Sequence, residues 1–90
     1  MMMRKPMNQK IPVQLGHKLK MIREHLGYTL DEMAEAVGKS DVSRRSRIYE
    51  WEHGQRQIDL IYLLTYAQLA NISTDVLLDD KIDLILSDEG

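Results

Sequence analysis

Four residues that commonly end helices divide most of this chain into short segments. Gly27, Gly38 and Gly54 each follow a run of helix-forming residues, and Asn71 occupies a similar place further along. Glycine and asparagine readily adopt the left-handed conformation in which many helices end. We therefore expect several short helices joined by short connections.

Apolar residues in the first segments recur at intervals of three or four, the spacing of an amphipathic helix. The first helix is expected to begin at Pro12, which suits the first helical position, and to run for about fourteen residues. Thr29 and Glu32 predict a capping box at the start of a second helix. A third helix is predicted from residue 43 or 44 to residue 53.

The second half of the chain continues the helical pattern. Asp59 is suited to cap a fourth helix, and Ser73 is suited to cap a short fifth helix that carries residues 76–78. The apolar face of the fourth helix is expected at Leu60, Leu63, Leu64, Ala67 and Ala70. Residues 80–90 fit either a strand or a helical turn. These features predict an all-α domain over residues 12–79, preceded by a flexible basic arm at residues 1–11.

The composition excludes several classes of function. Cysteine is absent, so disulfides, thiolate metal sites and a thiol nucleophile are excluded. No apolar run approaches the ~20 residues that cross a bilayer, and the amino-terminal residues do not resemble a signal peptide, so we expect a cytoplasmic protein. His17, His25 and His53 lack the spacing of metal ligands, and no cofactor is expected. No catalytic motif is visible, so we expect no enzyme activity.

Charge is distributed unevenly, although the net charge is only −2. Residues 1–57 hold eleven Lys and Arg against seven Asp and Glu, a balance of +4. Residues 58–90 hold one Lys against seven acids, a balance of −6. This asymmetry fits a small protein with one anion-facing surface, although chance clustering on a solvated surface would look the same.

The second and third helices carry the motif that indicates function. A short capped helix, a turn and an Arg-rich helix closing with Trp51-Glu52-His53-Gly54 resemble the helix-turn-helix of Cro and phage repressors, the XRE family. The resemblance continues in order through residues 19–29, 30–38, 48–54 and 60–78. It implies a five-helix, lambda-repressor-like fold and a sequence-specific DNA-binding regulator, expected to act as a dimeric repressor.

The sequence departs from the family at three places. Thirteen residues separate Gly38 from Glu52, about four more than the family usually has, and the extra residues fall in the turn near residues 39–43. Leu30 stands where the family often has a phosphate-contacting Gln, and Ile58 where it often has Pro. The longer turn could change the angle between the two helices or add a contact to the DNA backbone.

The outward face of the third helix holds the candidates for base contacts. Ile48 and Trp51 are expected to point into the core. The resemblance places the following residues on the DNA-facing side: Arg45, Ser46, Tyr49 and Glu50. Arg45 can donate two hydrogen bonds to guanine, and Glu50 can accept one from cytosine. By composition alone the same arginines would be interpreted as a solvated helix face.

Other residues are expected to position the protein on DNA. Candidate phosphate contacts are Thr29, Lys39, Arg44, Arg47 and Arg56. Arg4, Lys5 and Lys10 of the arm are further candidates. The resemblance assigns a structural role to Arg23 and Glu52, because the family pairs an Arg late in the first helix with the Glu that closes the third. Such a pair would hold these two helices together.

A contact between two copies is expected in the acidic half, since the recognition helix must stay free for DNA. Its candidate residues are Ile61, Tyr62, Ile82, Leu84 and Leu86. The alternative is that the tail, residues 80–90, folds back on its own domain.

Double-stranded DNA is the expected partner, with the protein on the nucleoid when bound and no membrane contact. A phage or plasmid repressor, a restriction–modification controller and an antitoxin all fit this class. The same fold could instead be a protein-binding module, such as an antitoxin whose acidic half binds a basic toxin. RNA is disfavoured, because the sequence displays no aromatic residues for base stacking.

Overall fold

The computed structural model describes residues 12–86 of the 90-residue chain, and this part forms five helices and no strand. In chain order they are α1 (Leu15–Leu26), α2 (Leu30–Val37), α3 (Arg44–Glu52), α4 (Leu60–Ala70) and α5 (Thr74–Leu78). The predicted all-α fold is confirmed. The basic arm predicted at residues 1–11 and the last four residues of the tail lie outside the described residues.

The predicted helix ends are confirmed in part, since Asp59 and Ser73 stand at the N-cap positions of α4 and α5 but neither side chain makes a cap hydrogen bond. The Thr29 hydroxyl accepts a hydrogen bond from the Glu32 amide at 3.1 Å, and the Glu32 carboxylate accepts one from the Thr29 amide at 2.9 Å, so the capping box forms. Gly27, Gly38 and Asn71 end α1, α2 and α4 in the left-handed conformation, with φ of 76°, 87° and 59°. Asn71 can adopt this conformation because its short polar side chain tolerates it.

The start of α1 differs from the prediction. The helix begins at Leu15, and Pro12 instead closes a turn in which its carbonyl accepts a hydrogen bond from the Leu15 amide at 3.3 Å. The carboxylate of Asp80 accepts hydrogen bonds from the amides of Val13 and Gln14, both at 2.9 Å. A carboxylate stabilises a helix amino terminus because the free amides there carry partial positive charge. The first turn of α1 therefore depends on a residue of the tail.

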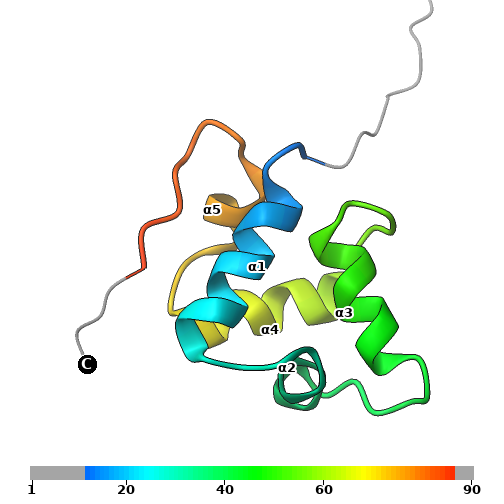
Figure 1. Ribbon diagram of the computed structural model, residues 1–90. Coiled ribbons are helices and arrows are strands. Elements are labelled where there is room, and N and C mark those ends of the chain that lie inside the picture. Colours follow the sequence, from blue (N-terminus) through cyan, green and yellow to red (C-terminus); the bar gives the residue numbers. More distant parts are fainter. Residues whose placement is uncertain (1–11, 87–90) are drawn as a thin grey trace, which may run out of the picture.

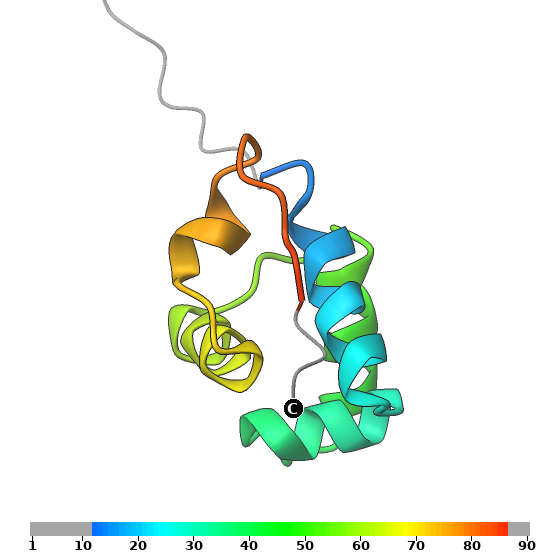
Figure 2. The same ribbon diagram turned by 90° about the vertical axis from the view of Figure 1, so that its left-hand side faces the viewer.

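The helices enclose one hydrophobic core. Helix α3 packs against α1 and α2, α5 packs against α1, and α4 contacts α1, α2 and α5 (Figures 1 and 2). The core consists of Leu15, Leu19, Ile22, Met33, Ala34, Val37, Ile48, Trp51, Ile58, Leu63, Tyr66, Ala67, Leu77 and Leu84. None of the helices within residues 12–86 is long and apolar enough to cross a membrane.

The predicted inward face of α4 was wrong in part. Leu63 and Ala67 are buried as expected, but Leu60 is 75% exposed and Leu64 is also exposed. Tyr66 takes the inward position and lies edge-on to Trp51, with ring centroids 6.4 Å apart. Nearly every residue of α4 is apolar or aromatic, so spacing alone could not decide which side faces the core. The packing of Tyr66 on Trp51 decides it.

The tail folds back on its own domain and is neither a strand nor a helix as far as residue 86. Lys18 is only 4% exposed, and its Nζ donates hydrogen bonds to the carbonyl oxygens of Val76, Asp79 and Ile82 at 2.6, 3.1 and 2.7 Å. Leu84 is 9% exposed and belongs to the core. The segment after α5 therefore completes the domain that the helices begin (Figure 2).

Candidate nucleic-acid interface

Helix α3 presents a polar face whose residues come together around one hollow. Ile48 and Trp51 are buried, as predicted, and fix the opposite side of the helix in the core. A hollow of about 330 Å³ is lined by Leu30, Arg45, Ser46, Tyr49, Glu50 and Gln55. The four residues expected to contact bases therefore share one surface. Leu30 lies at its rim, and it also packs against the core.

Two arginines at the start of α3 face an acid at the start of α2. The guanidinium of Arg45 lies 3.5 Å from the Asp31 carboxylate, and that of Arg44 lies 3.8 Å from it. All three side chains are substantially exposed, so these ion pairs contribute little to stability. A phosphate or a base edge can therefore replace Asp31 as the partner of either arginine at small cost.

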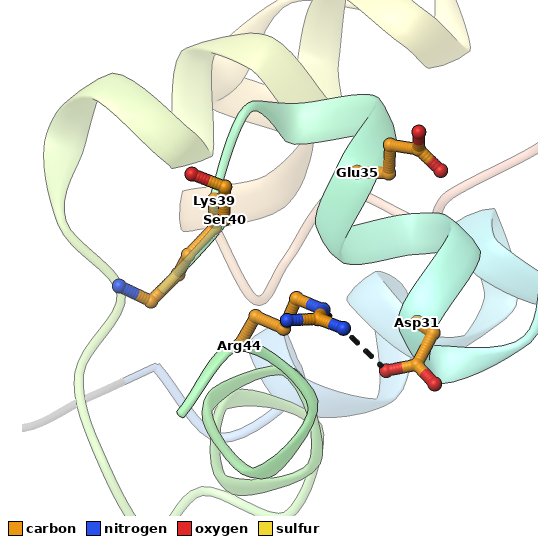
Figure 3. A pocket seen from close by; sticks show the side chains of 5 residues that line it. All are labelled: Asp31, Glu35, Lys39, Ser40 and Arg44. Carbon is orange, nitrogen blue, oxygen red and sulfur yellow. Dashed lines mark ion pairs between the residues drawn. The ribbon is translucent and has the colours of Figure 1, made fainter. Parts of the chain in front are cut away.

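The same acid lines a second hollow that the sequence did not reveal. It measures about 310 Å³ and lies between α2 and the start of α3, lined by Asp31, Glu35, Lys39, Ser40 and Arg44 (Figure 3). Arg44 reaches across it toward Asp31. The hollow lies between two helices that remain in contact with each other.

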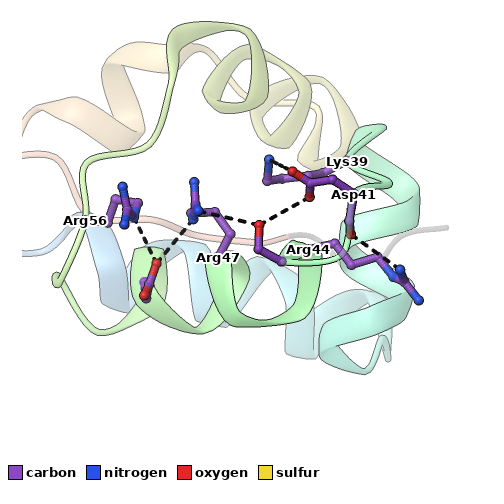
Figure 4. Close-up of polar contacts among 7 residues, drawn as sticks. Lys39, Asp41, Arg44, Arg47 and Arg56 are labelled. Atoms are coloured by element: carbon purple, nitrogen blue, oxygen red, sulfur yellow. Dashed lines mark hydrogen bonds and ion pairs between the residues drawn. The ribbon is translucent and has the colours of Figure 1, made fainter.

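Glu50 is shared between two arginines. Its carboxylate lies 3.2 Å from Nε of Arg47 and 2.9 Å from Nε of Arg56, which comes from the loop after α3 (Figure 4). Arg47 also donates to the Ser43 hydroxyl at 3.5 Å. These contacts orient Glu50 on the outward face of α3 and balance its negative charge with two cations.

Lys39, a predicted phosphate contact, is held by contacts within its own chain. Its Nζ is 3.3 Å from the Asp41 carboxylate and 5.3 Å from the centre of the Tyr62 ring, and most of its side chain is buried. An ammonium attracted to both a carboxylate and an aromatic face is held toward its own chain. A phosphate contact would require Lys39 to leave both partners.

The ion pair expected between Arg23 and Glu52 is present. Nε of Arg23 lies 2.6 Å from Oε2 of Glu52, Nη2 lies 3.1 Å from Oε1, and Nη1 donates to the Tyr28 carbonyl at 3.0 Å. The hydrogen bond to Glu52 raises the pKa of Arg23, against the opposing effect of burial. The Glu52 side chain is almost fully buried, so the two-point contact holds the end of α3 against α1.

Tyr66 lies in the core near this pair. Burial raises the pKa of its phenol well above the ordinary value of 10.0, and the negative charge of Glu52 adds to the shift. Its hydroxyl is buried without a hydrogen-bond partner among the described residues. The Tyr66 ring therefore contributes packing, whereas its hydroxyl makes no compensating hydrogen bond there.

The predicted contact residues between two copies are not brought together. Leu84 is in the core, and Leu86 packs against it. Tyr62 is half-buried, with its ring 5.3 Å from that of Trp51. Tyr62, Leu84 and Leu86 therefore already have packing partners within their own chain. Ile61 and Ile82 remain exposed, and Leu60 and Leu64 join Ile61 on α4.

Several residues that support the site were missed in the sequence. Lys18 lies beside Leu19 on the side of α1 that faces the core, and only this position in the sequence indicates that its side chain is buried. Gly16 carries no signal in the sequence, although it contacts the end of α3. Asp80 and Asp31 were two acids among many. Asp80 binds the start of α1, which is distant in sequence. Asp31 meets Arg44 and Arg45 only because of the path of the turn between α2 and α3.

Helix α3 is rich in Arg and exposed on one side. A capped helix precedes it, and a buried ion pair holds it against α1. These features define a helix-turn-helix regulator of the Cro and phage-repressor type. The helix-turn-helix domain family matches residues 16–81, and the chain belongs to this family.

One similar solved structure is a SinR protein/SinI protein complex, with a TM-score of 0.62 and 26% sequence identity. The match covers 74% of this chain and 62% of that chain, so the likeness extends over about three-fifths of that protein. No curated protein matches this sequence. The family and the likeness agree with the resemblance found in the sequence and with the class of DNA-binding regulators.

Proposed function

We propose that this protein is a sequence-specific transcriptional repressor that reads the major groove of double-stranded DNA with α3. The observation that carries the proposal is the hollow on α3, where Arg45, Ser46, Tyr49 and Glu50 lie together on a face turned away from the core. An α-helix fits the major groove, and the residues near its amino terminus reach base edges. The protein would act by binding alone, in the cytoplasm and on the nucleoid.

Base recognition would use the amino-terminal half of α3. Arg45 exchanges its exposed ion pair with Asp31 for two hydrogen bonds to O6 and N7 of a guanine. Ser46 and Tyr49 contact neighbouring base edges through their hydroxyl groups. Once phosphates replace Glu50 as the partner of Arg47 and Arg56, its carboxylate is free to accept a hydrogen bond from the N4 amino group of a cytosine.

Phosphate contacts would surround this region. Arg44, Arg47 and Arg56 lie on either side of the base-reading residues, and each is bound to a carboxylate that a phosphate can replace. Thr29 stands at the amino terminus of α2, where the free amides favour an anion. Lys39 contributes only if DNA draws it away from Asp41 and Tyr62.

We place the contact between two copies on α4. Leu60, Ile61 and Leu64 are 75%, 62% and 42% exposed, and Leu60 and Ile61 lie four and three residues before Leu64, so the three form one apolar stripe. Large apolar side chains grouped on a surface favour association, and a two-fold axis would pair the stripe with its own copy. Two α3 helices could then occupy half-sites about one helical turn apart, ~34 Å.

Selection of bound sequences from a random DNA pool tests the proposal. A short motif with two-fold symmetry is the expected result, with guanine at the position where Arg45→Ala abolishes the preference. Recovery of no motif, with equal binding to all sequences, would contradict sequence-specific recognition.

Light scattering tests the dimer separately. Ile61→Ser should shift the protein toward monomer, whereas Ile85→Ser, which changes the same residue type at an exposed tail position, should leave the dimer unchanged. The opposite pattern would place the interface in the tail.

A protein-binding role is the second candidate. The similar solved structure is a complex of two different proteins, and the apolar stripe of α4 could receive a different chain instead of a second copy. In that case the isolated protein would be monomeric, and a partner protein such as a toxin would bind α4. The Ile61→Ser variant would then lose that partner while still selecting the same DNA motif.

A further inference from the structure

The turn between α2 and α3 presents one apolar side chain to solvent. Val42 is 98% exposed, more than any other large apolar residue between residues 12 and 86. It lies two residues before Arg44, the first residue of α3. Single exposed valines are common on protein surfaces, but Val42 is set apart by its position at the amino-terminal end of the recognition helix.

Contacts on both sides of Val42 hold the turn in place. The Asp41 carboxylate is 3.3 Å from Nζ of Lys39 and 3.4 Å from the Ser43 hydroxyl. The Asp41 carbonyl accepts hydrogen bonds from the Arg44 amide at 3.1 Å and from the Arg44 guanidinium at 3.4 Å, the second of which is drawn in Figure 4. Lys39 in turn lies over the ring of Tyr62. The turn is therefore anchored to α4, while Val42 itself stays exposed.

The surroundings of Val42 suit nucleic acid better than an apolar protein surface. Arg44 and Arg45 follow directly, and both guanidinium groups are exposed. An apolar protein partner would have to desolvate these two cations to reach Val42. In the major groove, a phosphate pairs with Arg44 and a guanine edge with Arg45, while the C5-methyl group of thymine offers an apolar contact at the base edge.

We propose that Val42 is a further specificity-determining residue, which contacts the C5-methyl group of a thymine beside the bases read by α3. This inference rests on the proposed function, since it requires α3 to enter the major groove. Its geometric basis is that Val42 leads into the amino terminus of α3, the end of a recognition helix that reaches base edges.

Replacement of thymine by uracil, one position at a time in the selected DNA site, tests this contact because it removes only the methyl group. For the unmodified protein, one such replacement should lower the affinity about fourfold, the effect of losing one buried methyl group. For Val42→Ala, the affinity for the thymine site should fall by a similar factor, and the same uracil replacement should have no further effect.

Val13→Ala provides the matched control. Val13 is 84% exposed and lies near His53 and Gly54, at the opposite end of α3. This variant should keep the full penalty for uracil. Both substitutions should leave the melting temperature unchanged, because neither side chain is buried.

The inference is overturned if no uracil replacement affects the unmodified protein, or if Val42→Ala retains the whole penalty. Loss of affinity that is equal for all sequences would assign Val42 to the DNA backbone and would also overturn it. The proposed function stands in these cases as long as Arg45→Ala relaxes the preference for guanine. If the unmodified protein selects no motif at all, both proposals fail together.

Discussion

A methyl group added to Gly16 would lie 2.5 Å from the carbonyl oxygen of Glu52. The start of α1 and the end of α3 therefore approach so closely that no side chain fits between them. Further along α1, Arg23 binds the carboxylate of the same Glu52 at 2.6 Å. Glu52 therefore contacts α1 at two points, through its backbone carbonyl near Gly16 and through its side chain at Arg23. These two contacts fix the angle at which α3 packs against α1.

We expect Gly16→Ala to lower the free energy of unfolding by about 1–3 kcal/mol, because the added methyl group must push α1 away from backbone atoms of α3. Urea denaturation measures the change. In an unstrained helix the same substitution stabilises by up to about 1 kcal/mol, so the sign of the effect is diagnostic. Lys20→Ala, on the exposed side of α1, serves as the control and should change stability by less than about 0.5 kcal/mol.

Lys18→Met should destabilise the domain by about 2–4 kcal/mol. Methionine preserves most of the apolar stem but removes the ammonium that donates to three carbonyl oxygens, and those carbonyls then lose their partner. The amides of residues 82–86 should also exchange hydrogen faster, because the tail is released from α1. An unchanged exchange rate in this segment would show that Lys18 is not what holds the tail.

Asp80→Asn tests the other contact between the tail and α1, the one at the amino terminus of the helix. It removes the negative charge at the amino terminus of α1 while keeping an oxygen that can accept from Val13 or Gln14. We expect a loss of about 1 kcal/mol. Asp83→Asn, at an exposed acid three residues further along, should leave thermal stability unaffected.

Tyr66→Phe should leave stability unchanged or raise it by about 1 kcal/mol at neutral pH, because it removes a buried hydroxyl that has no partner within residues 12–86 and keeps the ring that packs on Trp51. A loss of more than 1 kcal/mol would reveal a partner for the hydroxyl, such as a buried water molecule.

The same residue predicts a pH dependence. The folded state raises the pKa of Tyr66 above its ordinary value of 10.0, so the phenol stays neutral in the folded chain while it ionises in the unfolded chain. Its contribution to stability is therefore complete below pH 10.0 and is lost as the pH rises above that value. Denaturation curves between pH 9 and 11 should show a steeper decline for the unmodified protein than for Tyr66→Phe.

Arg45→Ala should weaken binding to the selected DNA site by about 1–3 kcal/mol and relax the preference at one or two base pairs. Fluorescence anisotropy on a set of single-base variants of the site measures both effects. Arg56→Ala is the comparison, since Arg56 is proposed to contact phosphate only. It should weaken binding to all sequences alike and reduce the salt dependence by about one unit. Equal losses on every sequence for Arg45→Ala would reassign that residue to the backbone.

Some elements were predictable because their causes are local. The capping box of α2 needs only Thr29 and Glu32, three residues apart, and the left-handed ends of α1, α2 and α4 need only glycine or asparagine at one position. Ile48 and Trp51 were placed in the core correctly because the rest of α3 is strongly polar, which leaves a single side that can be buried.

The face of α4, the path of the tail and the surroundings of Lys39 were not predictable in this way. A helix as uniformly apolar as α4 can be buried on any side, and the packing of Tyr66 on Trp51 selects one. Lys18 and Asp80 are charged residues, a type that is usually found at the surface. They reach partners more than fifty residues away in the chain.

The sequence by itself determined the number of helices, most of their ends and the polar face of α3, because capping, left-handed turns and amphipathic spacing act within a few residues. Only the tertiary structure decided how α3 is held and where the tail goes. Those outcomes depend on the close approach of Gly16 to Glu52 and on a buried ammonium and a carboxylate satisfying distant backbone groups. Contacts of this kind exist only once the helices have packed, because a buried charge is stable only where its partners already surround it.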